Sequence, residues 1–205
     1  MKILVTGASG FIGSHLCETL LSKGYKVKAF VRYTSKQNIG WLKDINKKNL
    51  EIVFGDIVDF DSVKNAVEGC DYIFNLAASI SVPYSFKNPQ TFIDTNIIGG
   101  LNILRTSIIF KKKIKKIIQI SSSEVYGNNL FKTKKILKED TVTIAESPYA
   151  ATKISSDNIA ISMHQSSEVP VIVARPFNTF GPRQSLRAVI PTLITQFLSL
   201  NQNNN

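Results

Sequence analysis

The chain has 205 residues, of which 43% are hydrophobic and 20% are charged, and its formal net charge is +10. This composition is typical of a globular domain that buries enough apolar surface to fold without disulfide bonds. No window reaches the roughly 18 apolar residues of a membrane-spanning helix, and the apolar run near Met1 is too short for a signal-peptide core. We therefore expect a soluble, cytoplasmic protein without a membrane partner.

Short apolar runs alternate with helical stretches along the chain. Strands are predicted at Lys2–Val5, Val27–Val31, Glu51–Phe54, Tyr72–Leu76, Lys116–Ile120 and Val169–Ala174. Helices are predicted at Phe11–Ser22, Asp61–Val67, Pro89–Phe110, Pro148–Ser166 and Ala188–Leu200. Several strands are apolar on consecutive positions, which indicates that both of their faces are covered. The alternation predicts an α/β fold with a doubly wound parallel sheet.

The positive charge is concentrated in two short runs, KKKIKK at 111–116 and KTKKILK at 132–138. Such runs are typical of a solvated helix end and a solvated loop. They lack interleaved aromatic residues and any nucleic-acid motif, so we expect a phosphate-bearing small molecule rather than nucleic acid as the partner. The cysteines and histidines lack metal-ligand spacing, so we expect reduced thiols and no metal site.

A glycine-rich turn separates the first strand from the first helix, in the stretch KILVTGASGFIGSHL. Its spacing is GxxGxxG. Turns without side chains let the backbone approach a pyrophosphate, and the helix N-terminus adds N–H groups and partial positive charge. The turn therefore predicts a dinucleotide site of the Rossmann type. The residues assigned to it are Gly7, Ser9, Gly10, Phe11, Ile12 and Gly13.

The end of the second strand bears on which dinucleotide is bound. NAD sites usually place an acidic residue there for the ribose 2′-hydroxyl, whereas this chain has Val31 and Arg32, with Lys36 following. A 2′-phosphate suits these cations, so NAD(P) is expected with NADP favoured; the alternative is that Arg32 is an ordinary surface cation. Further cofactor contacts are predicted from the ends of the next two strands, at Asp56, Ile57, Leu76, Ala77 and Ala78.

Tyr149 and Lys153 lie four residues apart in YAATK, on one face of a predicted helix. A free phenol has a pKa of about 10, so it is a poor base at neutral pH. A nearby lysine and a positively charged nicotinamide ring both favour the phenolate. We therefore expect Tyr149 to act as an acid–base group that Lys153 supports, and both to contact the cofactor.

The stretches TGASGFIGSHL, GDI, NLAA, TNIIGGLNIL, SSSEVYG, SPYAATK and RPFNTFGPRQ occur in this order and cover nearly the whole chain. In these motifs the chain resembles the extended short-chain dehydrogenase/reductases that act on nucleotide sugars. By this resemblance Ser122 relays the C4 proton to Tyr149, Ser123 helps the C6 hydroxide to leave, and Glu124 removes the C5 proton. The hydroxyl-Ser-Glu order is similar to GDP-mannose 4,6-dehydratases, which generally use NADP.

The stretches FVRYTSKQNIGWL, SISVPYSF and GPRQSLRAVIPTLI also resemble N-acetylhexosamine 4,6-dehydratases of legionaminic-acid-type pathways. The chain departs from the family pattern at Gly100 and Ser122, where threonine is more usual. The family further implies a homodimer formed through a four-helix bundle. A sugar-nucleotide substrate is implied, and the residues assigned to it are Ser81, Tyr84, Asn178, Arg183 and Arg187.

Family members continue into a second lobe that closes over the sugar nucleotide. We therefore expect residues 1–200 to form an NAD(P)-binding domain with the start of the substrate-binding region, and 201–205 to be a disordered tail. We expect such a chain to bind NADP with little turnover. Three alternatives remain open: a UDP-glucuronate decarboxylase, a 4-epimerase, which typically lacks the glutamate, and an inactive cofactor-binding module.

Overall fold

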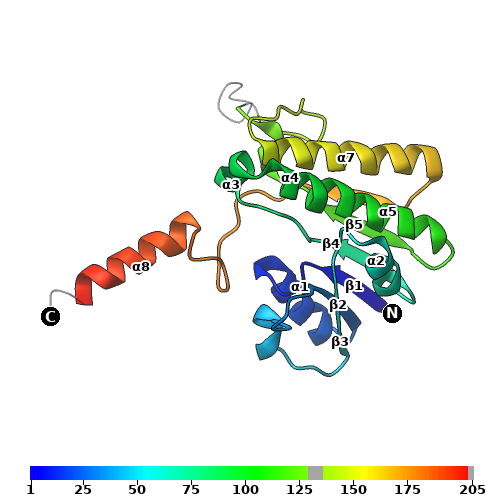
Figure 1. Cartoon of the computed structure of the whole chain (residues 1–205), viewed down its shortest axis with the longest axis horizontal. Coiled ribbons are helices and arrows are strands. Elements are labelled where there is room, and N and C mark those ends of the chain that lie inside the picture. Colours follow the sequence, from blue (N-terminus) through cyan, green and yellow to red (C-terminus); the bar gives the residue numbers. More distant parts are fainter. Residues whose placement is uncertain (129–135, 203–205) are drawn as a thin grey trace.

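A computed structural model describes residues 1–128 and 136–202 of the chain, and side chains as far as Leu200. The expected basic loop at 132–138 therefore lies mostly outside the described residues. All pairings in the sheet are parallel, and the strand order is β3-β2-β1-β4-β5-β6 (Figure 1). The strands are β1 (Lys2–Thr6), β2 (Lys26–Arg32), β3 (Leu50–Gly55), β4 (Tyr72–Asn75), β5 (Lys116–Ile120) and β6 (Val171–Ala174). The predicted doubly wound α/β fold is confirmed.

Helices cover both faces of this sheet. They are α1 (Phe11–Ser22), α2 (Phe60–Val67), α3 (Val82–Lys87), α4 (Pro89–Phe92), α5 (Gly99–Ile109), α7 (Pro148–Ser167) and α8 (Val189–Gln202). Three further helical segments are not α-helical. They are the 3₁₀ helices η1 (Gly40–Asp44) and η3 (Ser123–Tyr126) and the π-helix η2 (Ile93–Ile98).

Each face of the sheet has its own apolar core, because successive side chains of a strand point to opposite faces. Leu4 of β1 belongs to the core beneath α2, α5 and α7. Its neighbours Ile3 and Val5 belong to the other core, with Cys17 of α1 and Leu42 of η1. Both faces of the strands are therefore buried, as their consecutive apolar residues predicted.

Several predicted boundaries were wrong. The long helix expected at Pro89–Phe110 is present as far as Ile109, although its middle, η2, winds as a π-helix between α4 and α5. The short helix α3 was not predicted, although Ser81 caps it and Pro83 stands in its first turn. Strand β6 begins only at Val171, after Pro170, which has no N–H for a ladder bond.

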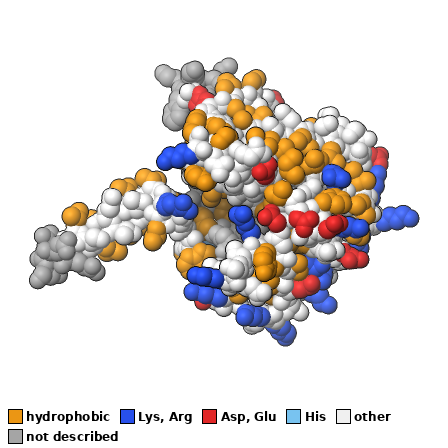
Figure 2. Space-filling model, viewed as in Figure 1, with side chains coloured by type: hydrophobic (Ala, Val, Ile, Leu, Met, Phe, Trp, Pro, Cys, Tyr) orange, Lys and Arg blue, Asp and Glu red, His pale blue; other side chains and the backbone are white. Residues whose placement is uncertain are grey.

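Helix α8 projects away from the rest of the molecule and carries apolar side chains along its exposed surface (Figures 1 and 2). Its helical residues extend to Asn201 and Gln202, which we had assigned to a disordered tail; the remainder of that tail, 203–205, lies outside the described residues. The exposed apolar side chains of this helix are Val189, Ile190, Leu193, Ile194, Phe197, Leu198 and Leu200.

Candidate functional site

The glycine turn has a backbone that tolerates no side chain at two of its positions. Gly7 has a φ of 63°, and a Cβ there would lie 3.0 Å from the carbonyl oxygen of Leu76 on the neighbouring chain segment. A Cβ on Gly13 would lie 2.2 Å from the carbonyl oxygen of Gly7, so helix α1 packs directly on the turn. No side chain caps the amides at the start of α1, where Gly10 is the N-cap. Uncapped amides behind a glycine turn fit a pyrophosphate.

A cleft of about 420 Å³ opens beside this turn, across the carboxyl ends of β1 to β4. It brings together seven of the residues predicted to bind a dinucleotide, namely Gly7, Ser9, Arg32, Asp56, Ile57, Ala77 and Ala78. Seven further residues complete its walls and were not predicted: Phe30, Gly55, Val58, Ser79, Thr91, Asp94 and Thr95. Its position is the one at which doubly wound sheets bind ligands, where the strand order reverses beside β1.

Arg32 stands at the mouth of this cleft, with 81% of its side chain exposed. Its Nε lies 4.0 Å from Oδ2 of Asp56, another of the predicted cofactor contacts. Asp56 also accepts a hydrogen bond from the backbone N–H of Val58 through Oδ1. The long, exposed contact is a weak ion pair, so the guanidinium is available to an additional anion at the cleft.

The reactive side chains lie beyond the cleft, where α7 begins against the end of β5. Ser147 caps α7 by accepting from the N–H of Ala150 at 3.0 Å, and this places Tyr149 in the first turn. Tyr149 is 7% exposed. Burial raises the pKa of Tyr149, the hydrogen bond with the Ser122 hydroxyl lowers it, and the negative charge of Glu124 raises it. The net effect is a raised pKa, so the chain without a cofactor does not by itself favour the phenolate form of Tyr149.

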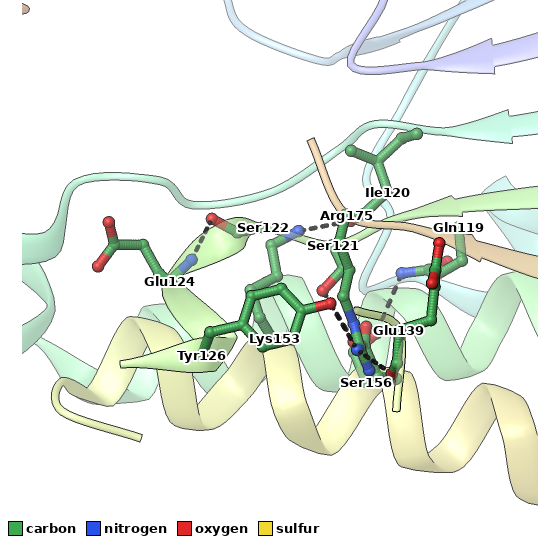
Figure 3. A network of polar contacts seen from close by, with 11 residues as sticks. Gln119, Ile120, Ser121, Ser122, Glu124, Tyr126, Glu139, Lys153, Ser156 and Arg175 are labelled. Carbon is green, nitrogen blue, oxygen red and sulfur yellow. Dashed lines mark hydrogen bonds and ion pairs between the residues drawn. The ribbon is translucent and has the colours of Figure 1, made fainter. Parts of the chain in front are cut away.

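Lys153 lies one turn further along α7 and is 4% exposed. Its Nζ donates to the carbonyl oxygen of Ile120 at 2.8 Å (Figure 3). Burial lowers its pKa to about 8, and the negative charge of Asp157 opposes this change. The contributions to the pKa of Tyr149 are burial, Ser122 and Glu124. An effect of Lys153 and a bound nicotinamide ring on the pKa of that phenol stays a prediction.

Glu124 and Ser123 belong to η3, the turn that directly follows the end of β5. The hydroxyl of Ser122 accepts from the N–H of Glu124 at 3.2 Å, and the Glu124 side chain is exposed. Ser123 is buried, and its N–H donates to the carbonyl of Pro176. Ser122 thus links the two acid–base candidates, because it bonds both the Tyr149 phenol and the Glu124 backbone.

An amide connects the cleft to the reactive helix. Asn96 of η2 accepts from the N–H of Ser79 at 2.8 Å and donates to the hydroxyl of Thr152 at 3.0 Å. Ser79 lines the cleft and Thr152 directly precedes Lys153, so this side chain fixes the two parts of the site relative to each other. The sequence analysis gave Asn96, which lies in TNIIGGLNIL, no role, because the residues that it bonds are distant in sequence.

The residues assigned to the sugar nucleotide lie in different surroundings. The Ser81 hydroxyl caps α3 by accepting from the N–H of Tyr84, and Tyr84 contacts the ring of Phe92, which in turn contacts the ring of Tyr149. Asn178 and Arg187 are exposed on the segment after β6. Arg183 instead lies against α1, where its guanidinium pairs with Glu18 at 2.9 Å.

The described residues contain no group of three or more His, Cys, Asp or Glu side chains arranged for a metal ion. Within the same part of the chain, no helix has the length and hydropathy that crossing a membrane requires.

Comparison with known proteins shows the family of this chain. The family model described as GDP-mannose 4,6 dehydratase matches residues 4–205. Protein CapI of Staphylococcus aureus is 36% identical over 89% of this chain and 55% of its own length. The dTDP-D-glucose 4,6-dehydratase of Dictyostelium discoideum is 34% identical over 97% of this chain and 48% of its own length.

Solved structures agree. A UDP-N-acetylglucosamine 4-epimerase from Methanobrevibacter ruminantium is 36% identical with a TM-score of 0.85, covering 97% of this chain and 63% of that one. A double mutant of DesIV, a dTDP-glucose 4,6-dehydratase from Streptomyces venezuelae solved with NAD bound, is 29% identical with a TM-score of 0.86, covering 97% and 62%. The chain thus spans about half the length of the curated relatives and less than two thirds of the solved chains.

Proposed function

Because this chain belongs to the GDP-mannose 4,6-dehydratase family, we propose that it serves the 4,6-dehydration of a nucleotide-activated sugar, a lyase reaction that yields a 4-keto-6-deoxy sugar nucleotide. The observation that carries this proposal is the packing of η3, which carries Glu124, against α7, which carries Tyr149; the charge of Glu124 raises the pKa of the phenol. A 4-epimerase needs acid–base chemistry at C4 alone. A second base beside the C4 base, here a carboxylate, is what removal of the C5 proton requires.

Each side chain has one task in this reaction. Tyr149 takes the proton of the sugar 4-hydroxyl, and Ser122, which is hydrogen-bonded to the phenol, relays it. When bound, the nicotinamide dinucleotide accepts a hydride from C4 and returns it to C6. The ketone at C4 makes the C5 proton acidic, and Glu124 removes it. Glu124 then gives this proton to the C6 hydroxyl, which Ser123 assists and which leaves as water.

We propose that the cleft holds NADP in preference to NAD. Support comes from the exposed guanidinium of Arg32 at the end of β2, where an NAD site usually has a carboxylate. Asp56 stands opposite Arg32 and is suited to the adenine amino group. Ala77 and Ala78 leave room for the nicotinamide half. Relatives of known structure were solved with NAD, so the preference rests on Arg32 alone.

Residues 1–200 are proposed to form the cofactor-binding domain with the start of the substrate site. Tyr84, Asn178 and Arg187 are the side chains that remain exposed for a sugar nucleotide. Arg183 can contact the substrate only if its ion pair with Glu18 breaks.

We also propose that the chain forms a homodimer through α5 and α7, which pack against each other in one chain. Exposed isoleucines on and beside these helices support this proposal, because such side chains are usually covered by a partner. They are Ile98, Ile108, Ile109 and Ile161.

A screen of sugar nucleotides by mass spectrometry tests the reaction. The chain is incubated with NADP or NAD and with UDP-, GDP- and dTDP-linked hexoses, N-acetylhexosamines and glucuronate. Loss of water from one of them supports the proposal. Release of carbon dioxide from UDP-glucuronate would instead identify a decarboxylase, and a product of unchanged mass with inverted C4 would identify an epimerase. If the chain binds the dinucleotide but forms no product, it acts as a cofactor-binding module. Slow formation of a product agrees with the little turnover that we expect from the sequence.

A further inference from the structure

Behind the reactive side chains lies an ion pair that the reaction described above does not use. Arg175 directly follows β6, and its Nε donates to Oδ2 of Asp157 on α7 at 3.0 Å. The Asp157 side chain is 2% exposed and that of Arg175 is 16% exposed. Replacing a buried ion pair by apolar residues commonly leaves stability unchanged or higher. The reason for such a pair is therefore to be sought in geometry.

Arg175 also holds the turn that carries Glu124. Its Nη1 donates to the phenol oxygen of Tyr126 at 3.1 Å and to the carbonyl oxygen of Glu139 at 3.0 Å. The guanidinium carbon lies 5.2 Å from the centre of the Tyr126 ring. Tyr126 is the last residue of η3, two positions after Glu124. One guanidinium thus bonds both α7 and η3 (Figure 3).

Asp157 reaches the same region from the other side. Oδ2 accepts from the hydroxyl of Ser121 at 2.9 Å. Ser121 stands between Ile120, whose carbonyl holds the Lys153 ammonium, and Ser122, which bonds the Tyr149 phenol. Asp157 is also one helical turn beyond Lys153 on α7, and its charge opposes the effect of burial on that lysine.

The backbone around Arg175 reinforces these contacts. Ser121 donates its N–H to the carbonyl of Ala174 at 2.8 Å, and Ser123 donates to that of Pro176 at 3.0 Å. The residues on either side of Arg175 are therefore paired with the motif that leads into Glu124. Three elements that carry reactive groups, namely the end of β5, η3 and α7, meet at one ion pair.

We propose that Asp157 and Arg175 are positioning residues, which clamp the turn carrying Glu124 to the helix carrying Tyr149 and Lys153. The inference rests on the proposed function for its catalytic meaning, but the clamp itself is a property of the chain. A fixed distance between a C4 base and a C5 base is what two successive proton transfers on one sugar ring require.

The test uses variants that release one contact at a time. Tyr126→Phe keeps the ring and removes only the bond from Arg175 to η3. Arg175→Lys keeps the charge but cannot fork between Asp157 and Tyr126. Tyr72→Phe on β4 is the matched control. Hydrogen exchange of the 121–127 peptide is followed by mass spectrometry in the chain alone, with urea unfolding as the measure of global stability.

We expect exchange in this peptide to rise about five-fold in Tyr126→Phe and in Arg175→Lys, the change that loss of one hydrogen bond produces. Exchange in the second half of α7 and the urea midpoint should stay near wild type in Tyr126→Phe. Unchanged protection of the peptide in both variants would overturn the proposal. A uniform rise in exchange across the chain, together with a lower urea midpoint, would also overturn it, because it would show that the pair only stabilises the fold.

If the sugar screen identifies a substrate, Tyr126→Phe should slow water loss by at least ten-fold more than it slows C4 oxidation, because only Glu124 is released. Equal slowing of the two steps would contradict the catalytic meaning of the clamp. Carbon dioxide release or inversion at C4 in the wild-type chain would contradict the proposed function and leave the exchange result to decide the clamp.

Discussion

Ser122 bonds the two groups on which the proposed chemistry depends: its hydroxyl is hydrogen-bonded to the phenol of Tyr149 and accepts from the N–H of Glu124 at 3.2 Å. A single small side chain therefore contacts the acid–base phenol on one element and the backbone of the glutamate on another. This relation makes the two proton transfers separable by mutation.

Glu124→Gln should abolish water loss while C4 oxidation persists. The amide keeps the size of the side chain and cannot accept the C5 proton, so elimination should fall by about 10²-fold or more, the usual contribution of a general base. Solvent deuterium at C5 and cofactor absorbance under single-turnover conditions report the two steps separately. Glu124→Asp is the control that keeps the charge. Loss of oxidation together with elimination, in a folded Glu124→Gln variant, would make Glu124 a structural residue.

Arg32→Asp should reverse the preference for the dinucleotide. The substitution places a carboxylate where a 2′-phosphate would lie, so NADP binding should weaken roughly ten-fold or more, as expected for loss of one charge-assisted contact. Isothermal titration of wild type and variant with both dinucleotides measures this. Lys48→Asp, a charge change of the same size at an exposed position just before β3, at the opposite edge of the sheet from the cleft, is the control. Tighter binding of NAD than NADP by the wild-type chain would refute the assignment.

Lys153 should leave a signature in the pH dependence of stability. Its pKa is about 8 in the folded chain and 10.5 ordinarily, so the folded chain binds fewer protons between these values. Its contribution to the free energy of unfolding therefore rises with pH, by about 2 kcal/mol from pH 8 to about 10. Above this range the raised pKa of Tyr149 acts in the opposite direction.

Urea unfolding of wild type and Lys153→Met at several pH values measures this difference. The free energy of unfolding of the wild type should increase relative to that of Lys153→Met as pH rises. Lys23→Met, at an exposed lysine, should show the same pH dependence as the wild type. Parallel curves for wild type and Lys153→Met would show that burial does not alter the lysine.

Ile109→Asp should shift the chain toward the monomer if α5 and α7 form the proposed dimer. A charge in an apolar contact is strongly unfavourable, and Ile109 is exposed in the single chain, so the fold itself should tolerate the change. Sedimentation velocity at micromolar concentration measures the outcome. Ile194→Asp, at an exposed isoleucine of α8, which projects away from both helices, is the control. A wild-type monomer at that concentration would rule the interface out.

The sequence predicted the sheet and the cofactor cleft well, because these depend on local signals. Apolar runs locate the strands, and the glycine turn and Arg32 follow them directly. The π-helical winding of η2 within the helix at Pro89–Phe110 was not predicted, since Asn96 takes its partners Ser79 and Thr152 from distant elements.

The surroundings of the reactive groups were harder to predict than their identity. Tyr149 and Lys153 were found by their spacing, but the direction in which the pKa of Tyr149 is shifted depends on burial, which no short motif records. Asp157 and Arg175 were missed for the same reason: the two residues meet only when β6 pairs with β5 beside α7. Arg183 was placed with the substrate from its motif, whereas the fold brings it to Glu18.

The contact between Gly7 and Leu76 has a consequence for the order of folding. All glycines of the turn lie within the first 13 residues, yet the wall against which Gly7 is packed comes from β4, 69 positions later. Closing so long a loop is slow compared with forming α1 or the neighbouring β1–β2 pair. Affinity for a dinucleotide should therefore appear late during refolding, when β4 has joined β1, and a fluorescent nucleotide analogue would report the docking of the two halves of the sheet.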